Sequence, residues 1–220
     1  MITLSPSLLS ADLSRLGEEI RCVTDAGATY IHIDVMDGAF VKSISYGMPV
    51  IKSIRKCTDA VFDVHLMIEE PIRYIDDFAV SGADIITVHQ EACKDLPATI
   101  AAIKDSGKKA GVAIRPDTAV SVLEDIAGLV DMILVMTVYP GFGGQKFIPE
   151  SLGRIRETKA LLDSKGIKDM DIQVDGGIYL DNVRDVLDAG ANVIVAGSSV
   201  FRGDAAANVA GFFEIFKEYQ

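Results

Sequence analysis

The chain has 220 residues, of which 49% are hydrophobic, enough for one domain over residues 1–220 with a sizeable core. Its net charge is −11 and no basic patch with interleaved aromatic residues occurs, which argues against nucleic acid or an anionic membrane as a partner. No apolar run reaches about 18 residues, and the first residues lack a basic segment before an apolar one, so we expect no transmembrane helix and no signal peptide.

Runs rich in β-branched residues recur along the chain and alternate with amphipathic helical patterns. The predicted strands are Ile2–Ser7, Tyr30–Val35, Ala60–Leu66, Ile85–Val88, Lys109–Ile114, Met132–Met136, Asp171–Val174 and Val193–Ala196. The predicted helices are Asp12–Ala26, Met48–Lys56, Pro71–Val80, Pro97–Ser106, Ala119–Leu129, Pro149–Ser164, Leu180–Ala189 and Asn208–Phe216. These units predict an α/β fold, a single (β/α)8 TIM barrel, with a doubly wound sheet as the alternative.

Two of the chain's histidines lie on apolar strands that share one pattern. Alternate residues of a strand share a face, so His32, Asp34 and Met36 point one way from the first of these strands. On the second, Asp63, His65 and Met67 share a face in the same manner. Two buried histidines with ordinary hydrogen bonds are the structural alternative, but a metal site explains why both strands repeat the pattern.

The seventh predicted strand is followed by Asp175, which in a barrel lies at the same end as the two histidines. His32, Asp34, His65 and Asp175 form a two-histidine, two-carboxylate set suited to one Zn²⁺, Fe²⁺, Mn²⁺ or Co²⁺ ion. The ligand types do not select one of these metals, and we favour Zn²⁺. Carboxylates from two separate strands can flank a substrate, which is the geometry of an epimerisation.

Three glycine-containing loops follow the sixth, seventh and eighth predicted strands, where barrels often bind phosphate through backbone N–H groups. They contain Gly141, Phe142, Gly143 and Gly144; Gly176 and Gly177; and Gly197 and Ser198. Tight turns or a flexible connector are the structural alternatives. Met36, Met67 and Met136 either line this site with water-excluding surface or are ordinary core methionines.

The three cysteines, Cys22, Cys57 and Cys93, are widely spaced and form no Cys-x-x-Cys pair. We interpret them as reduced structural residues of a cytoplasmic protein. None of them lies beside a candidate catalytic base, so the sequence offers no thiol nucleophile.

Seven motifs, in order along essentially the whole chain, resemble those of the ribulose-phosphate 3-epimerase family. They are Ser5–Asp12, His32–Gly38, His65–Met67, Met136–Val138, Pro140–Gln145, Val174–Gly177 and Val195–Ser198. Each motif alone is modest, whereas the ordered set is highly specific.

The resemblance implies a metal-dependent epimerase that inverts C3 of a ketose phosphate, interconverting ribulose 5-phosphate and xylulose 5-phosphate through an enediolate. It implies that His32, Asp34, His65 and Asp175 hold one divalent ion per chain, with Asp34 as proton acceptor and Asp175 as proton donor. It also implies that Ser7 and His65 contact the substrate, that the glycine loops and Ser198 hold the substrate and its phosphate, and that the protein is a homo-oligomer.

Two places depart from the family pattern. Lys42 and Ser43 replace the usual Pro-Asn, and Tyr139 replaces the usual Asn or Asp before Pro140. We therefore keep allulose-6-phosphate 3-epimerase as an alternative to the pentulose enzyme. A non-catalytic phosphosugar-binding barrel is an alternative of another class, and a related lyase is disfavoured because Met36 stands where its lysine is needed.

Overall fold

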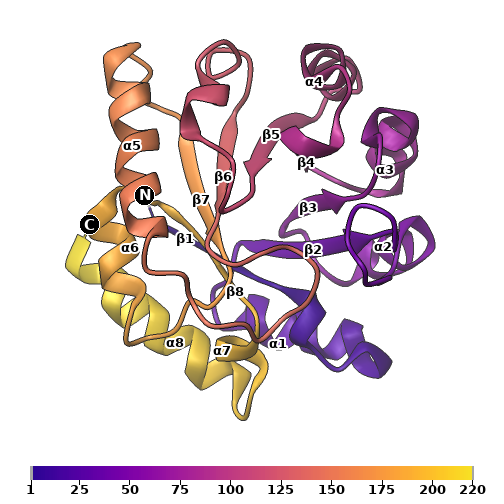
Figure 1. Ribbon diagram of the computed structural model, residues 1–220. Coiled ribbons are helices and arrows are strands. Elements are labelled where there is room, and N and C mark those ends of the chain that lie inside the picture. The colour runs from indigo at the N-terminus through magenta and orange to yellow at the C-terminus, as the bar shows by residue number, and fades with distance from the viewer. Residues whose placement is uncertain (1, 220) are drawn as a thin grey trace.

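The computed structural model describes residues 2–219, in which eight parallel strands form one sheet. Around the barrel the order is β1, β8, β7, β6, β5, β4, β3 and β2, and a parallel bridge between Ser7 and His32 joins β1 to β2. The strands are β1 Thr3–Pro6, β2 Tyr30–Met36, β3 Val61–Met67, β4 Ile85–His89, β5 Lys109–Ile114, β6 Met132–Met136, β7 Asp171–Asp175 and β8 Val193–Ala196. The predicted (β/α)8 barrel is confirmed, and its nearly closed wall is seen end-on in Figure 1.

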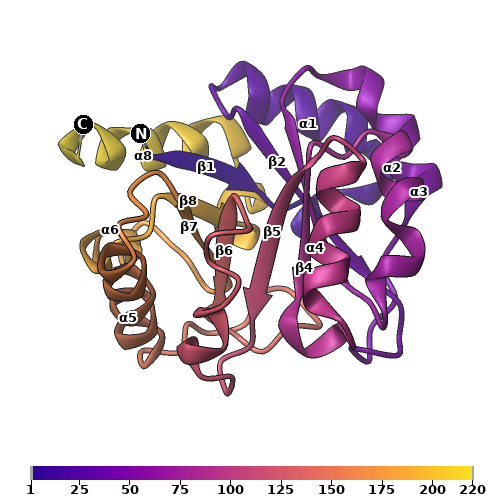
Figure 2. The ribbon, with the colours of Figure 1, turned by 90° about the horizontal axis from the view of Figure 1, so that it is seen from above.

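Helices cover the outside of the barrel, as the side view in Figure 2 shows. They are α1 Leu16–Asp25, α2 Met48–Ile54, α3 Ile75–Ser81, α4 Leu96–Asp105, α5 Ser151–Ser164, α6 Val183–Ala189, α7 Ser198–Phe201 and α8 Ala205–Phe216. The end of α3 illustrates how the chain turns back to the next strand. Gly82 adopts φ +115° there, in the left-handed region that glycine enters without strain.

The predicted helix Ala119–Leu129 is wrong. The structure has a short 3-10 helix at Val120–Leu123, followed by turns. The reason lies in the spacing of the buried side chains Val120, Leu123 and Ile126, which recur every three residues. Backbone bonds from Glu124 N to Ser121 O, from Ile126 N to Leu123 O and from Leu129 N to Ile126 O span the three residues of a 3-10 turn, and only the bond from Ala127 N to Leu123 O among the described bonds of this segment spans four.

The outward and inward faces of the strands differ in chemistry. On β2 the outward residues Ile31, Ile33 and Val35 belong to the main hydrophobic core between sheet and helices. The inward face of the barrel combines apolar side chains such as Ala113 and Leu134 with the fully buried polar residues Ser5, Asp63, Thr87 and Gln173. Buried polar groups are costly unless they are hydrogen-bonded, and Ser5 and Gln173 both donate to Oδ2 of Asp63 in this interior.

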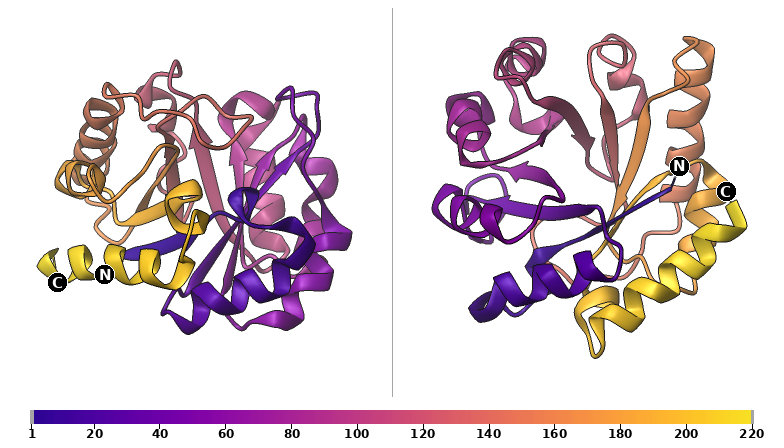
Figure 3. Two further views of the ribbon diagram at one scale, coloured as in Figure 1. Left: turned by 90° about the horizontal axis from the view of Figure 1, so that it is seen from below. Right: turned by 180° about the vertical axis from the view of Figure 1, so that it is seen from behind.

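The loop between β6 and α5 passes across the carboxyl ends of the strands, in front of the barrel in Figure 1. The chain termini lie close to each other beside α8 in both views of Figure 3, away from this loop. Within residues 2–219 no helix has the length and apolar character required to cross a membrane.

Candidate metal centre and adjoining pocket

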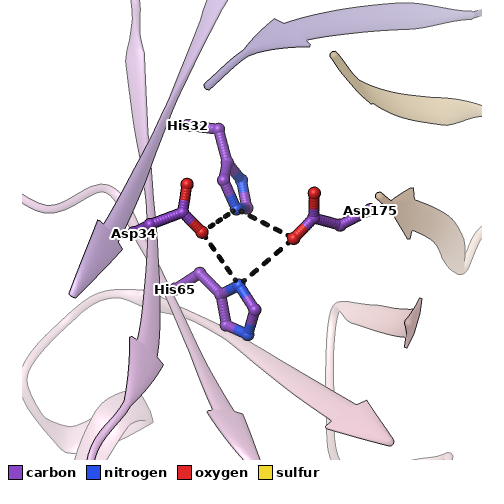
Figure 4. A group of neighbouring side chains, drawn as sticks. All are labelled: His32, Asp34, His65 and Asp175. Carbon is purple, nitrogen blue, oxygen red and sulfur yellow. Dashed lines mark ion pairs between the residues drawn. The ribbon is translucent and has the colours of Figure 1, made fainter. Parts of the chain in front are cut away.

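Four side chains meet at the carboxyl ends of the strands, and their ligand atoms all lie within 4.8 Å of one another. His32 and Asp34 come from β2, His65 from β3 and Asp175 from the end of β7. Asp34 is in register with His65, and His32 precedes Asp34 by two residues, so all three point into the barrel. Figure 4 shows the two carboxylates on either side of the two imidazole rings.

The contacts among the four side chains are nearly uniform in length. Asp34 Oδ1 lies 3.4 Å from Nε2 of His32 and 3.5 Å from Nδ1 of His65. Asp175 Oδ2 lies 3.9 Å and 3.7 Å from the same two nitrogen atoms. One carboxylate oxygen from each aspartate and one nitrogen from each histidine therefore surround a common point.

The two nitrogen atoms that face this point, His32 Nε2 and His65 Nδ1, are buried and lack a hydrogen-bond partner among residues 2–219. Buried polar atoms are rarely left unpaired, and two in one centre indicate a missing partner that accepts lone pairs. Two imidazoles and two carboxylates are the donor set of a divalent transition metal. The residues at this position thus fit the ion that the sequence predicts.

The two aspartates differ in acidity. Burial raises the pKa of Asp34, but the adjacent imidazoles of His32 and His65 outweigh burial and leave that pKa well below its usual range. Burial, with the negative charge of Asp34, raises the pKa of Asp175 to about 7. The hydroxyl of Ser7 donates to Oδ2 of Asp34 at 2.5 Å, which holds the oxygen that faces away from the histidines.

Each histidine has a partner on its far side. His32 Nδ1 lies 2.8 Å from Asp63 Oδ2, an oxygen that also accepts from Ser5 Oγ and Gln173 Nε2. His65 Nε2 lies 2.9 Å from Nε2 of His89, the third histidine. Such partners fix the orientation of a ligating imidazole ring.

A pocket adjoins the four side chains, and it is lined by all but two of the residues predicted from the sequence. His32 and His65 are fully buried below it. The predicted residues that line it are Ser7, Asp34, Met36, Met67, Met136, Gly141, Phe142, Gly143, Gly144, Asp175, Gly176, Gly177, Gly197 and Ser198. The three methionines are at most 4% exposed and form an apolar floor beside the aspartates.

The loops after β6, β7 and β8 pack against one another at one side of the pocket. Gly177 has φ +68°, and a Cβ there would lie 2.4 Å from the backbone nitrogen of Phe147, so only glycine fits. The hydroxyl of Tyr179 lies 2.9 Å from Oγ of Ser198, which links the loop after β7 to the start of α7. The three loops therefore form one wall rather than separate flexible connectors.

The positions that depart from the family pattern do not all reach the pocket. Tyr139 lines it and is 48% exposed. Lys42 and Ser43 are not among the residues that line it, although their neighbour Val41 packs near Gly141. A difference in substrate is therefore to be sought first at Tyr139.

Asp63, His89 and Glu91 were given no role on the basis of the sequence. Asp63 shares the inward face with His65, and this alternation was the available signal. The predicted fourth strand ended at Val88, whereas β4 ends at His89 and places that ring inside the barrel. Extending the predicted fourth strand by one residue would have placed His89 on the inward face, since alternate residues of a strand share a face.

Comparisons with known proteins show which family this chain resembles along most of its length. A family model described as the ribulose-phosphate 3 epimerase family matches residues 3–201. The chain is 53% identical over 201 residues to the ribulose-phosphate 3-epimerase of Bacillus subtilis (strain 168), covering 91% of this chain and 93% of that one. It is 52% identical over 202 residues to the enzyme of the same name from Synechocystis, covering 91% and 87%.

Among solved structures, KGPDC from Streptococcus mutans superimposes with a TM-score of 0.72 at 15% sequence identity. That match covers 99% of this chain and 99% of the other. At this low identity the likeness concerns the barrel fold alone.

Proposed function

We propose that this chain, which belongs to the ribulose-phosphate 3-epimerase family, inverts C3 of D-ribulose 5-phosphate to give D-xylulose 5-phosphate. One observation carries the proposal beyond family membership. Asp34 and Asp175 reach the same two imidazole nitrogens from strands that β1 and β8 separate, and both line the pocket. A substrate carbon between them is within reach of an acid on one face and a base on the other.

The different acidities of the two carboxyls support the assignment of their roles. Because the pKa of Asp34 is depressed, it is a carboxylate at neutral pH and accepts the proton from C3. Because burial and the negative charge of Asp34 raise the pKa of Asp175, we assign it as the group that returns a proton to the opposite face. In the reverse direction the two residues exchange roles.

We propose that His32, Asp34, His65 and Asp175 hold one divalent ion per chain, most favourably Zn²⁺, with Fe²⁺, Mn²⁺ and Co²⁺ as the other candidates. Such an ion supplies positive charge beside the substrate oxygens and so stabilises the negative charge of an enediolate. Met36, Met67 and Met136 exclude water from the same region, which strengthens these electrostatic interactions.

The sugar phosphate is assigned to the wall built from the loops after β6, β7 and β8, together with Ser7 and His65 near the reacting carbon. This wall offers backbone N–H groups and the hydroxyl of Ser198 rather than cationic side chains. Backbone groups bind phosphate through local dipoles, which suits a protein whose net charge is −11.

Tyr139 favours one second candidate, epimerisation of D-allulose 6-phosphate. Its side chain lies in the pocket lining where the family usually has a smaller polar residue. The remaining alternative, a phosphosugar-binding barrel without catalysis, would have no use for two opposed carboxylates.

The cellular setting is part of the proposal. The three cysteines are free thiols, which supports a reducing, cytoplasmic location. We also propose that the protein is a homo-oligomer, as the resemblance to the family implies. Light scattering on the purified protein measures the number of subunits.

The function is tested by solvent exchange at C3. Purified protein is incubated in D₂O with ribulose 5-phosphate and, in parallel, with allulose 6-phosphate, and deuterium at C3 is followed by NMR. We expect exchange and xylulose 5-phosphate formation with the pentulose at the higher kcat/KM. Faster turnover of the hexulose would show that the protein is an allulose-6-phosphate 3-epimerase. No exchange with either sugar would show that it binds a phosphosugar without catalysis.

A further inference from the structure

His89 is a buried histidine that lies outside the reaction pocket. Its side chain is fully buried at the end of β4, and it is not among the residues that line the pocket. Its Nε2 lies 2.9 Å from Nε2 of His65, and its Nδ1 lies 3.2 Å from Oε2 of Glu91. The three side chains thus form a line that leads from the candidate metal centre toward the surface.

The positions of the ring protons on His89 and His65 can be derived from the carboxylate of Glu91. Its Oε1 accepts the backbone N–H of Arg115 at 2.8 Å and also the hydroxyl of Thr118. A carboxylate has no proton to give, so His89 must donate from Nδ1 to Oε2. The lone pair of His89 is then on Nε2, and His65 must carry its proton on its own Nε2. Nδ1 of His65 is left with a lone pair directed at Asp34 and Asp175.

The other histidine is fixed by a separate anchor. Asp63 accepts from Nδ1 of His32, which leaves the lone pair of that ring on Nε2. The two rings therefore present different nitrogen atoms to the same point, and each choice is imposed by a carboxylate: directly at His32, and through a second imidazole at His65.

We propose that His89 and Glu91 are positioning residues that set the tautomer of His65, so that Nδ1 is free to bind the metal ion. The inference rests on the proposed function only in assigning His65 to the metal. It predicts that a change at Glu91, which contacts neither substrate nor metal ligands, alters the nitrogen that His65 presents.

Glu91→Gln separates this idea from a packing effect. The backbone N–H of Arg115 requires an oxygen at the Oε1 position, so the NH₂ group of the introduced amide faces Nδ1 of His89. His89 must then accept at Nδ1 and donate from Nε2, which forces the proton of His65 from Nε2 to Nδ1. The substitution changes one atom of the side chain and removes almost no packing volume.

The experiment has two readouts. Long-range ¹H–¹⁵N NMR of the metal-free protein assigns the protonated nitrogen of each histidine, and competition with a chelator measures the Zn²⁺ affinity. We expect His65 to be protonated on Nε2 in the wild type and on Nδ1 in Glu91→Gln, with Zn²⁺ affinity about 10- to 100-fold weaker, the usual effect of losing such a partner.

Glu70→Gln is the matched control. Glu70 is also a glutamate in a loop beyond the carboxyl end of a strand, and its carboxylate accepts the backbone N–H of Lys94, but it has no histidine partner. Its variant should keep both the wild-type tautomers and the wild-type Zn²⁺ affinity.

The proposal is overturned if His65 keeps its proton on Nε2 in Glu91→Gln, whether or not the affinity falls. It is equally overturned if the proton moves and the Zn²⁺ affinity stays within about twofold of wild type, since 10-fold is the smallest expected effect. If wild type itself binds no Zn²⁺, the metal assignment fails, and the tautomers of the metal-free protein still decide whether Glu91 controls His65.

Discussion

Asp34 and Asp175 approach the same pair of imidazole nitrogens at 3.4–3.9 Å, although β1 and β8 lie between their strands. The histidines lower the pKa of Asp34, whereas burial and the negative charge of Asp34 raise the pKa of Asp175 to about 7. One site thus makes one aspartate, Asp34, suited to act as a base and the other, Asp175, suited to act as an acid.

Asp175→Asn should reduce kcat for the epimerisation by about 100-fold to 10,000-fold, the usual contribution of a positioned acid. The amide is nearly isosteric, so the fold should persist, as circular dichroism and urea unfolding can verify. Asp169→Asn, an exposed residue before the start of β7, is the control and should turn over at the wild-type rate. Near-wild-type turnover in Asp175→Asn would remove this residue from the mechanism.

Removal of the metal should abolish turnover. Elemental analysis should find about one divalent ion per chain, since four side chains surround a single point. Dialysis against a chelator should inactivate the protein, and adding back Zn²⁺, Fe²⁺, Mn²⁺ or Co²⁺ in parallel should identify the ion that restores the rate. A chelator already saturated with metal serves as control, and full activity in metal-free protein contradicts the assignment.

Gly177→Ala should destabilise the protein by about 1–3 kcal/mol, the cost of a non-glycine residue in strained backbone, and should raise KM. The added Cβ would meet the backbone of Phe147 and push apart two of the loops that form the pocket wall. Gly153→Ala is a matched control because its Cβ meets nothing within 4 Å on α5. That variant should be more stable by about 0.5–1 kcal/mol in urea unfolding, with unchanged KM.

Acid should weaken the fold through Glu91. Burial raises the pKa of this carboxyl, but hydrogen bonds from His89, Arg115 and Thr118 outweigh it and hold the pKa at about 2, below the ordinary 4.5. The unfolded chain therefore binds more protons in that range, so the contribution of Glu91 is complete above pH 4.5 and lost as the pH falls toward 2. In metal-free protein, the difference in unfolding free energy between wild type and Glu91→Gln should shrink over this window. A constant difference between about pH 6 and pH 3 would exclude that linkage.

Local patterns were sufficient to predict the barrel and the four converging side chains. Strands such as Tyr30–Met36 combine β-branched residues with a period of two, and this alone determines that His32 and Asp34 face inward together. Parallel strands then bring their carboxyl ends to one edge, which is why Asp175 could be placed beside them without any contact being known.

The supporting hydrogen bonds could not be predicted in this way. Asp63 on β3 pairs with His32 on β2, and His65 on β3 pairs with His89 on β4. Nothing in the spacing within one strand says which neighbour's side chain lies opposite at that depth of the barrel. The helix wrongly expected at Ala119–Leu129 failed for a different reason, since periods of 3.0 and 3.6 are hard to separate over three buried positions.

The bridge between Ser7 and His32 has a mechanical consequence. Among the described residues, β1 and β2 are joined by this one bridge, whereas every other adjacent pair of strands has at least three paired positions. The strands β1 and β2 are therefore the most weakly paired neighbours in the barrel, and their bridge lies directly beneath the reaction centre. A metal ion or substrate that binds both Asp34 and Asp175 links β2 to β7 across this weak pairing. The ligand-bound protein should therefore resist proteolysis near β1 and β2 better than the ligand-free protein.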